Sequence, residues 1–164
     1  MKRVLPSTNL TLKDIPSQNR FGIERKHDVH TGLDIFADVG EVVTAYEKGV
    51  VVNICQFTGI NVGSEWWNDT WAVLIEGKSG VILYGEIKVN EELKVGDFVE
   101  AGQPIGTVMQ VLKVFKNKPM SMLHIELYKH GYKGDGEVWI EERVRKLWKF
   151  VRPAELLDVE ELFK

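Results

Sequence analysis

Short apolar runs separated by glycine turns limit the fold of this chain more than any other feature of its sequence. The runs are rich in Val, Ile, Leu and aromatic residues, and they occupy residues 49–55, 71–76, 81–87, 104–108 and 123–128. Runs of this length and composition, bounded by turn residues, are typical of β-strands. The sequence therefore predicts a mainly β protein.

The glycine turn at residues 77–80 predicts how two of these strands pair. It reads Gly-Lys-Ser-Gly and lies between the runs 71–76 and 81–87. Two strands joined by such a short turn form an antiparallel hairpin. We expect a mainly antiparallel sheet, arranged as a sandwich or barrel.

The C-terminal part follows a different pattern. Apolar residues recur at helical spacing within residues 141–150, and Pro153 can open a second short helix that carries Leu156 and Leu157. We expect these short C-terminal helices, within residues 141–162, to cap one end of the sheet. Residues 1–19 are expected to be an irregular N-terminal arm, and residues 20–164 a single β domain.

Charge and cysteine content narrow the function classes. The formal net charge is −3, without a long run of one sign, so we expect no nucleic-acid partner and no membrane partner. Cys55 is the single cysteine, which excludes an intrachain disulfide and a cysteine-rich zinc cluster. Any metal must therefore be held by histidines and carboxylates.

The N-terminus predicts no secretion by a signal peptide. Its charged start is broken by Pro6 before any apolar stretch develops. A cytoplasmic location is the default expectation, and an extracytoplasmic or phage-borne location is the alternative.

Two segments carry candidate metal ligands. In His30-Thr31-Gly32-Leu33-Asp34 the outer side chains lie on one face of a strand, and Gly32 leaves room for an ion between them. His124 shares its strand face with Met122 and Glu126, while the alternate residues are apolar. Two imidazoles and a carboxylate are a standard protein ligand set for catalytic zinc, although other divalent metals accept it. A structural role for each histidine is the alternative that spacing alone leaves open.

Motifs across residues 20–131 resemble those of the lysostaphin-like zinc metallopeptidases, which cut peptide cross-links in bacterial cell walls. Residues 20–25 look like the family's Phe-Gly-x-Arg motif, 30–34 match His-x-Gly-x-Asp, 40–50 resemble its Gly-x-x-Val-x-Ala and Gly-x-Val elements, 95–106 look like its paired-glycine turn, and 123–126 look like the end of His-x-His-x-Glu. The resemblance implies a duplicated hybrid motif fold, a zinc ion held by His30, Asp34 and His124, and a peptide or peptidoglycan-like substrate.

Two departures from the family pattern affect the chemistry. Met122 and Glu86 stand where the family has catalytic histidines, which are thought to activate water and to hold the developing oxyanion. The thioether of Met122 can do neither. Glu86 can serve as a general base or as a fourth metal ligand, and both roles stay open.

Other residues receive simpler predictions. Glu126 either accepts a hydrogen bond from an imidazole or is an ordinary surface carboxylate. Trp66 and Trp67 are expected to line a substrate groove, Trp71 to lie in the core, and Tyr84 to border the metal cleft. His27 and His130 are expected to be exposed and without a role.

The sequence thus favours a zinc-binding metallopeptidase-like protein related to cell-wall peptide endopeptidases, with catalysis kept in altered form or lost. The alternative is a binding or regulatory module that keeps the fold and the metal and holds a protein partner. Residues 95–106 also resemble domains that carry biotin or lipoate, but Lys113 lacks the flanking residues that such domains need.

Overall fold

The structure, a computed structural model, describes residues 1–25, 29–134 and 153–164 and forms one open sheet in that part of the chain. All strand pairs in it are antiparallel, which confirms the predicted fold class. The strands are β1 (Leu33–Phe36), β2 (Val42–Thr44), β3 (Gly49–Thr58), β4 (Thr70–Gly77), β5 (Gly80–Val89), β6 (Phe98–Val99), β7 (Pro104–Val108), β8 (Met122–Tyr128) and β9 (Leu156–Leu157). Short 3-10 helices cover Leu12–Asp14, Ser17–Asn19, Ile60–Val62 and Val159–Phe163.

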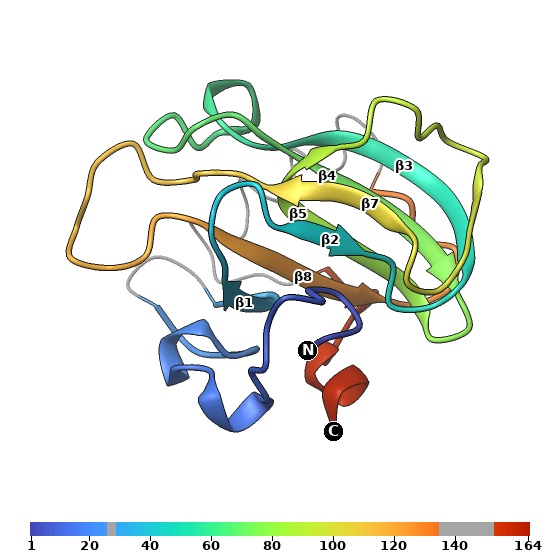
Figure 1. Cartoon of the computed structure of the whole chain (residues 1–164), viewed down its shortest axis with the longest axis horizontal. Coiled ribbons are helices and arrows are strands. Elements are labelled where there is room, and N and C mark those ends of the chain that lie inside the picture. The colour runs from blue at the N-terminus through green and yellow to red at the C-terminus, as the bar shows by residue number, and fades with distance from the viewer. Residues whose placement is uncertain (26–28, 135–152) are drawn as a thin grey trace.

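Strand β5 is the branch point of the sheet (Figure 1). One of its edges pairs with β4 through the predicted hairpin, in which Gly77 faces Gly80. On its other edge β8 pairs up to the position where Gly85 faces His124, and β7 takes over where Ile87 faces Val108. Glu86 therefore lies where β5 changes its partner.

Side chains from the two faces of β5 enter different hydrophobic clusters. Ile82 and Tyr84 belong to the larger cluster, which also holds most of the apolar residues of β1, β2 and β7. Val81 and Leu83 belong to a smaller cluster, where they pack with Phe57. Strands that are buried on both faces read as nearly continuous apolar runs, which is why these segments stand out in the sequence.

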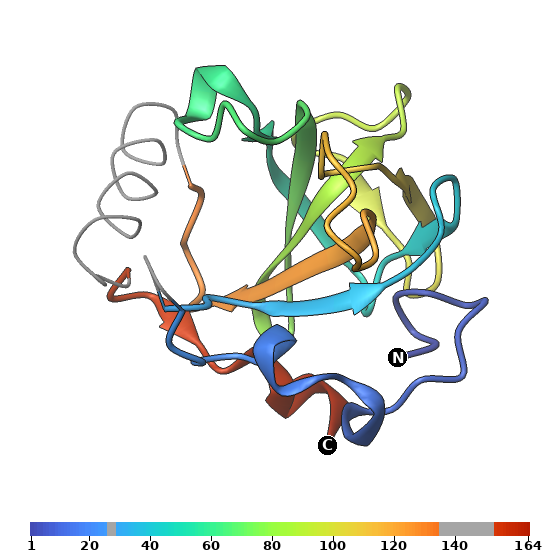
Figure 2. The same cartoon turned by 90° about the vertical axis from the view of Figure 1, so that its left-hand side faces the viewer.

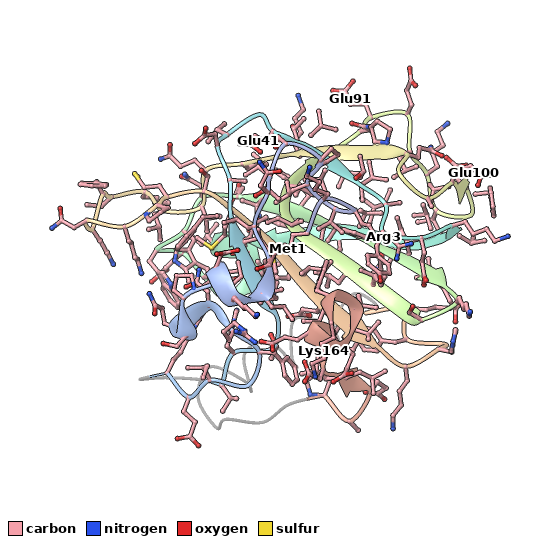
Figure 3. The ribbon with its side chains drawn as sticks, turned by 60° about the horizontal axis from the view of Figure 1, so that its bottom comes forward. Met1, Arg3, Glu41, Glu91, Glu100 and Lys164 are labelled. Carbon is pink, nitrogen blue, oxygen red and sulfur yellow. The ribbon has the colours of Figure 1, made fainter. Side chains whose placement is uncertain are left out.

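Both ends of the chain pack on the same side of the sheet (Figures 1, 2 and 3). Val4 and Leu5 are fully buried, and the backbone of Thr44 in β2 donates to the carbonyl of Val4 over 3.0 Å. At the other end, the guanidinium of Arg20 pairs with the carboxylate of Glu160 at 2.6 Å. The N-terminal arm and the C-terminal segment thus help to enclose the core.

The predicted second C-terminal helix is wrong at Leu156 and Leu157. These residues form β9, in which Leu157 pairs with Leu127 of β8, and a 3-10 helix begins only at Val159. Strand β1 occupies the edge of β8 only as far as Ile125, so the next residues of that edge are open to a further strand. The helix predicted at residues 141–150 lies outside the described residues. No helix in the part that the structure describes is long and apolar enough to cross a membrane.

Candidate metal centre

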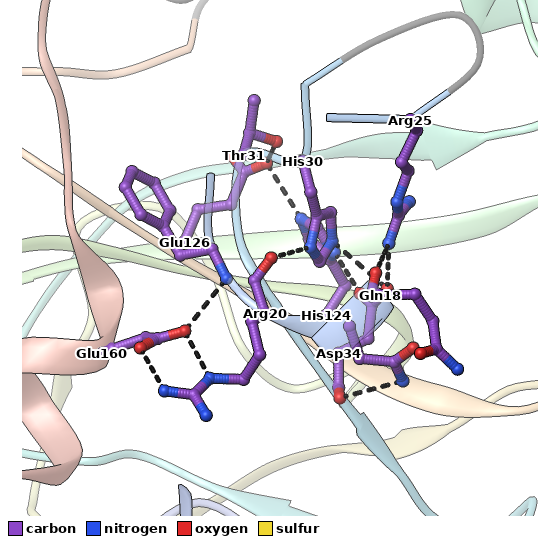
Figure 4. Close-up of polar contacts among 11 residues, drawn as sticks. Gln18, Arg20, Arg25, His30, Thr31, Asp34, His124, Glu126 and Glu160 are labelled. Atoms are coloured by element: carbon purple, nitrogen blue, oxygen red, sulfur yellow. Dashed lines mark hydrogen bonds and ion pairs between the residues drawn. The ribbon is translucent and has the colours of Figure 1, made fainter. Parts of the chain in front are cut away.

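His30, Asp34 and His124 come together at the junction of β1 and β8 (Figure 4). Asp34 on β1 is the direct cross-strand neighbour of His124 on β8, and His30 precedes β1. One potential ligand atom from each residue lies within 4.8 Å of the others, and all three side chains are buried. The structure therefore assembles the predicted ligand residues in one place.

Gly32 permits the close approach of β1 to β8. A Cβ atom at this position would lie 2.5 Å from the carbonyl oxygen of Ile125 and 2.7 Å from Nε2 of His124. Both distances are far below van der Waals contact. The space left by Gly32 thus accommodates the His124 ring and the β8 backbone, whereas the sequence suggested that it accommodates an ion.

The tautomer of His30 is set by a backbone carbonyl. Its Nδ1 lies 2.9 Å from the carbonyl oxygen of Arg20, which can only accept, so Nδ1 carries the proton and donates it. Its Nε2 is buried and lies 3.2 Å from Oδ2 of Asp34, yet it makes no hydrogen bond within the described residues. In the neutral ring this atom presents a lone pair next to a carboxylate, and a cation between the two removes the repulsion.

His124 lies between two carboxylates. Its Nδ1 is 2.6 Å from Oδ1 of Asp34, and its Nε2 is 2.9 Å from Oε1 of Glu126. Burial lowers the pKa of His124, but the hydrogen bonds to Asp34 and Glu126 outweigh burial and raise the pKa to about 10. Burial raises the pKa of Asp34, but the attraction of His30 in its charged form and the hydrogen bond to His124 hold it well below its ordinary value.

The carboxylate of Glu126 is shielded from solvent and accepts several hydrogen bonds. It is fully buried, accepts a 2.5 Å hydrogen bond from the Thr31 hydroxyl, and accepts a second from the hydroxyl of Tyr128. Of its two predicted roles, the structure shows the acceptor for the His124 imidazole. A hydrogen-bonded carboxylate of this kind fixes the orientation of a histidine ligand.

A β-bulge turns Glu86 toward the same cleft. Trp71 pairs with Ile87 and Ala72 with Gly85, so Glu86 is the extra residue, and its φ of 62° is left-handed. The bulge interrupts the alternation of side chains along β5, since Tyr84 and Ile87 both enter the larger hydrophobic cluster. Glu86 is 6% exposed and lines the cleft that contains the three candidate ligands.

The prediction that Tyr84 borders the metal cleft is wrong for the same reason. Its side chain is fully buried in the larger cluster, and its hydroxyl accepts a hydrogen bond from the backbone N–H of Tyr46 over 2.9 Å. Tyr84 and Glu86 would share a face only in a regular strand, and the bulge between Gly85 and Ile87 breaks that regularity.

The cleft has a volume of about 590 Å³, and its lining includes residues of the segments 64–67 and 116–119. Trp66 and Trp67 line it, as the sequence predicts for a groove, and so does Met122. Trp71, predicted to lie in the core, is instead 39% exposed. It is the second residue of β4, next to the bulge.

The remaining histidines lie apart from the site or cannot be placed. His130 has an exposed side chain next to Glu76, as expected. His27 lies outside the described residues.

Arg25 is a residue of the site that the sequence analysis missed. Its Nη2 donates to Oδ2 of Asp34 over 3.1 Å and to the carbonyl oxygen of Gln18 over 2.9 Å. One feature of the sequence pointed to Arg25, because it is the last residue of the motif at residues 20–25. The motif alone gives no role for its side chain.

Comparisons with known proteins agree with this fold. The sequence model of Peptidase family M23 matches residues 28–136. The crystal structure of cbpA from L. salivarius REN is similar in fold, with a TM-score of 0.55 and 19% identity over 91% of this chain and 86% of that one. No curated protein sequence matches the chain.

Two further solved structures are similar at lower TM-scores. The catalytic domain of the prophage-encoded M23 protein EnpA from Enterococcus faecalis has a TM-score of 0.47 and is 27% identical over 68% of this chain and 78% of that one. The catalytic domain of the antimicrobial peptidase lysostaphin from Staphylococcus simulans has a TM-score of 0.49 and is 20% identical over 75% of this chain and 87% of that one.

Proposed function

This chain belongs to peptidase family M23, and from that membership we propose that it is a zinc-dependent hydrolase of peptide bonds with Glu86 as its general base. The proposed zinc ligands are His30, Asp34 and His124. The proposed substrates are peptides of the kind that cross-link peptidoglycan.

The donor set fits zinc. Two imidazoles and one carboxylate are a usual ligand set for catalytic zinc, and a fourth position stays open for substrate or water. The hydrogen bond from His30 Nδ1 to the Arg20 carbonyl leaves Nε2 with a lone pair, and that of His124 Nε2 to Glu126 leaves Nδ1 for the metal. When bound, zinc would supply the Lewis acidity that polarises a peptide carbonyl and lowers the pKa of water.

The observation that carries the proposal is the bulge that places the carboxylate of Glu86 in the ligand cleft. A left-handed conformation at a residue with a Cβ costs about 1–2 kcal/mol, and strain of this kind clusters at functional sites. A carboxylate in this cleft can take a proton from the attacking water and deliver it to the leaving amine.

The geometry favours Glu86 as a base over Glu86 as a fourth ligand. Among the described residues, the group whose ligand atoms lie within 4.8 Å of one another contains His30, Asp34 and His124 and does not extend to Glu86. A base that acts through a water needs this greater separation from the metal ligands.

Met122 is the observation that favours the second candidate, a non-catalytic binding module. It lines the cleft where the family pattern has a histidine, and its thioether is a poor hydrogen-bond partner for an oxyanion. A module of this kind would bind zinc and a peptide without cutting it.

The test compares zinc-loaded wild-type protein with Glu86→Gln on soluble peptidoglycan fragments and on their cross-link peptides. We expect the wild type to hydrolyse a peptide bond, and Glu86→Gln to lose about 100-fold or more in kcat at unchanged zinc content. Lys88→Gln, an exposed position of the same strand, is the matched control and should change neither quantity.

Two results would contradict the proposal in different ways. Loss of zinc from Glu86→Gln would make Glu86 a ligand. Zinc-loaded wild type that binds the peptides but leaves them intact would favour the binding module.

A further inference from the structure

We infer that Arg25 provides the oxyanion-binding group that Met122 cannot provide. In this assignment its guanidinium donates hydrogen bonds to the peptide oxygen as negative charge develops on that oxygen. The inference rests on the proposed function and assigns a catalytic role to a residue outside the set of proposed ligands.

The guanidinium of Arg25 lies where it could bind an oxyanion. Nη2 of Arg25 lies 3.1 Å from Oδ2 of Asp34, and the same oxygen lies 3.2 Å from Nε2 of His30 (Figure 4). The guanidinium is therefore directly adjacent to the candidate ligand atoms, and Arg25 also lines the cleft. A peptide oxygen drawn toward a metal held by these ligands would arrive beside it.

Arg25 also has hydrogen-bond donors other than those of Nη2, which could bind an oxyanion. A guanidinium carries five N–H groups, and both N–H groups of Nη2 are used by Asp34 and the Gln18 carbonyl. Toward the residues that the structure describes, Nε and Nη1 donate no hydrogen bond, and the side chain is 34% exposed. These donors carry a permanent positive charge in the fork geometry that suits a developing oxyanion.

Two hydroxyls that line the cleft are committed elsewhere. Thr31 donates its hydroxyl proton to Glu126, and Ser64 is 1% exposed with its hydroxyl bonded to the backbone of Gly59. The guanidinium of Arg25 is preorganised, since the Gln18 carbonyl and Asp34 hold its Nη2 in place. Preorganised donors are the ones that stabilise developing charge most effectively.

A double-mutant cycle tests the assignment. We expect Arg25→Met to lower kcat by about 100-fold with the zinc content unchanged. In a Met122→His background the imidazole restores a donor, so the same Arg25→Met change should cost less than about 10-fold. Equal losses in the two backgrounds would overturn the inference, because they would show that the two positions do not share one role.

Binding of inorganic phosphate gives a readout that does not depend on turnover. Phosphate is a tetrahedral oxyanion, and titration calorimetry on zinc-loaded protein should show affinity about 10-fold or more lower for Arg25→Met than for wild type, with Arg25→Lys in between. Arg3→Met is the matched control, since Arg3 stacks over Tyr46 instead of lining the cleft.

The outcomes separate this inference from the proposed function. If the zinc-loaded wild type cuts no peptide, the proposed function fails, and phosphate affinity still decides whether Arg25 binds an oxyanion. Phosphate affinity that is unchanged in Arg25→Met overturns the inference. Loss of zinc from Arg25→Met also overturns it, because Arg25 would then only position Asp34.

Discussion

At the scale of single residues, each candidate ligand is held in place by another group. The Arg20 carbonyl holds His30, Glu126 holds His124, and Arg25 holds Asp34. The candidate ligands could be predicted from the sequence because their residue types and spacing are informative. The groups that hold these ligands in place could not be predicted, because a backbone carbonyl has no sequence signature and the acceptor role of Glu126 depends on how β8 packs.

Removal of the negative charge from Glu126 should weaken metal binding. Glu126→Gln keeps the size of the side chain but loses the charged acceptor for the Nε2 proton of His124. We expect the zinc affinity to fall by roughly 10–100-fold, measured by competition with a chelating dye. Glu76→Gln, next to the exposed His130, should leave the affinity unchanged.

A methyl group at Gly32 should damage the site and the fold together. The Cβ of Gly32→Ala would lie 2.5 Å from the backbone of Ile125, so β1 and β8 must move apart. We expect a loss of about 1–3 kcal/mol in the free energy of unfolding of the metal-free protein, and at least 10-fold weaker zinc binding.

Gly96→Ala separates these two effects. Its φ of +94° makes alanine unfavourable, but no atom lies within 4 Å of the added Cβ. It should therefore lower stability by about 1–2 kcal/mol in urea unfolding without changing the zinc affinity. Unchanged zinc affinity in Gly32→Ala would refute the role given to this close approach.

At the scale of secondary-structure elements, the bulge in β5 decides which side chains reach the cleft. The hairpin of β4 and β5 could be predicted because its glycine turn is explicit in the sequence. The bulge at Glu86 could not, because an inserted residue looks the same as a regular strand residue until the pairing of Trp71 and Ala72 is known. The bulge is therefore the reason that Tyr84 and Glu86 do not share a face.

The strain at Glu86 makes a prediction about stability. In an ordinary strand, glycine is less stable than alanine by roughly 0.5–1 kcal/mol. At Glu86 the left-handed φ should reverse this order, so Glu86→Gly should be more stable than Glu86→Ala by about 1 kcal/mol in urea unfolding. The pair Lys88→Gly and Lys88→Ala should keep the ordinary order. The ordinary order at both positions would mean that residue 86 is not strained.

At the scale of the whole molecule, the fold class followed from the apolar runs, because strands buried on both faces produce them. The packing of the two chain ends against the sheet could not be predicted from the sequence, since Val4 and Leu5 have no strand pattern and β9 is only two residues long. Long-range pairing decides their positions. The ion pair between Arg20 and Glu160 joins these ends, and the carbonyl of the same Arg20 holds His30.

This ion pair predicts a pH dependence of stability. The hydrogen bond from Arg20, supported by the Phe21 N–H and opposed by burial, lowers the pKa of Glu160 below 4.5. A carboxyl group with a lowered native pKa stabilises the fold fully above its unfolded pKa, and this stabilisation is lost as the pH falls through the native value. Wild type should therefore exceed Glu160→Gln in free energy of unfolding by roughly 2 kcal/mol at pH 7.

The same difference should shrink as the pH falls below 4.5 and vanish below the native pKa. Urea unfolding of both proteins between pH 7 and pH 3 measures it. Glu161→Gln, at an exposed ion pair, is the control and should show a much smaller difference. A difference between wild type and Glu160→Gln that does not depend on pH would contradict the role of the charge.

The most direct test of the account is the zinc content of protein purified without an affinity tag, measured by elemental analysis. We expect about one zinc per chain for the wild type and for His130→Ala, and almost none for His30→Ala and His124→Ala. Wild-type protein that takes up no zinc when zinc is added, or His30→Ala and His124→Ala variants that keep it, would contradict the claim that His30, Asp34 and His124 form a zinc site.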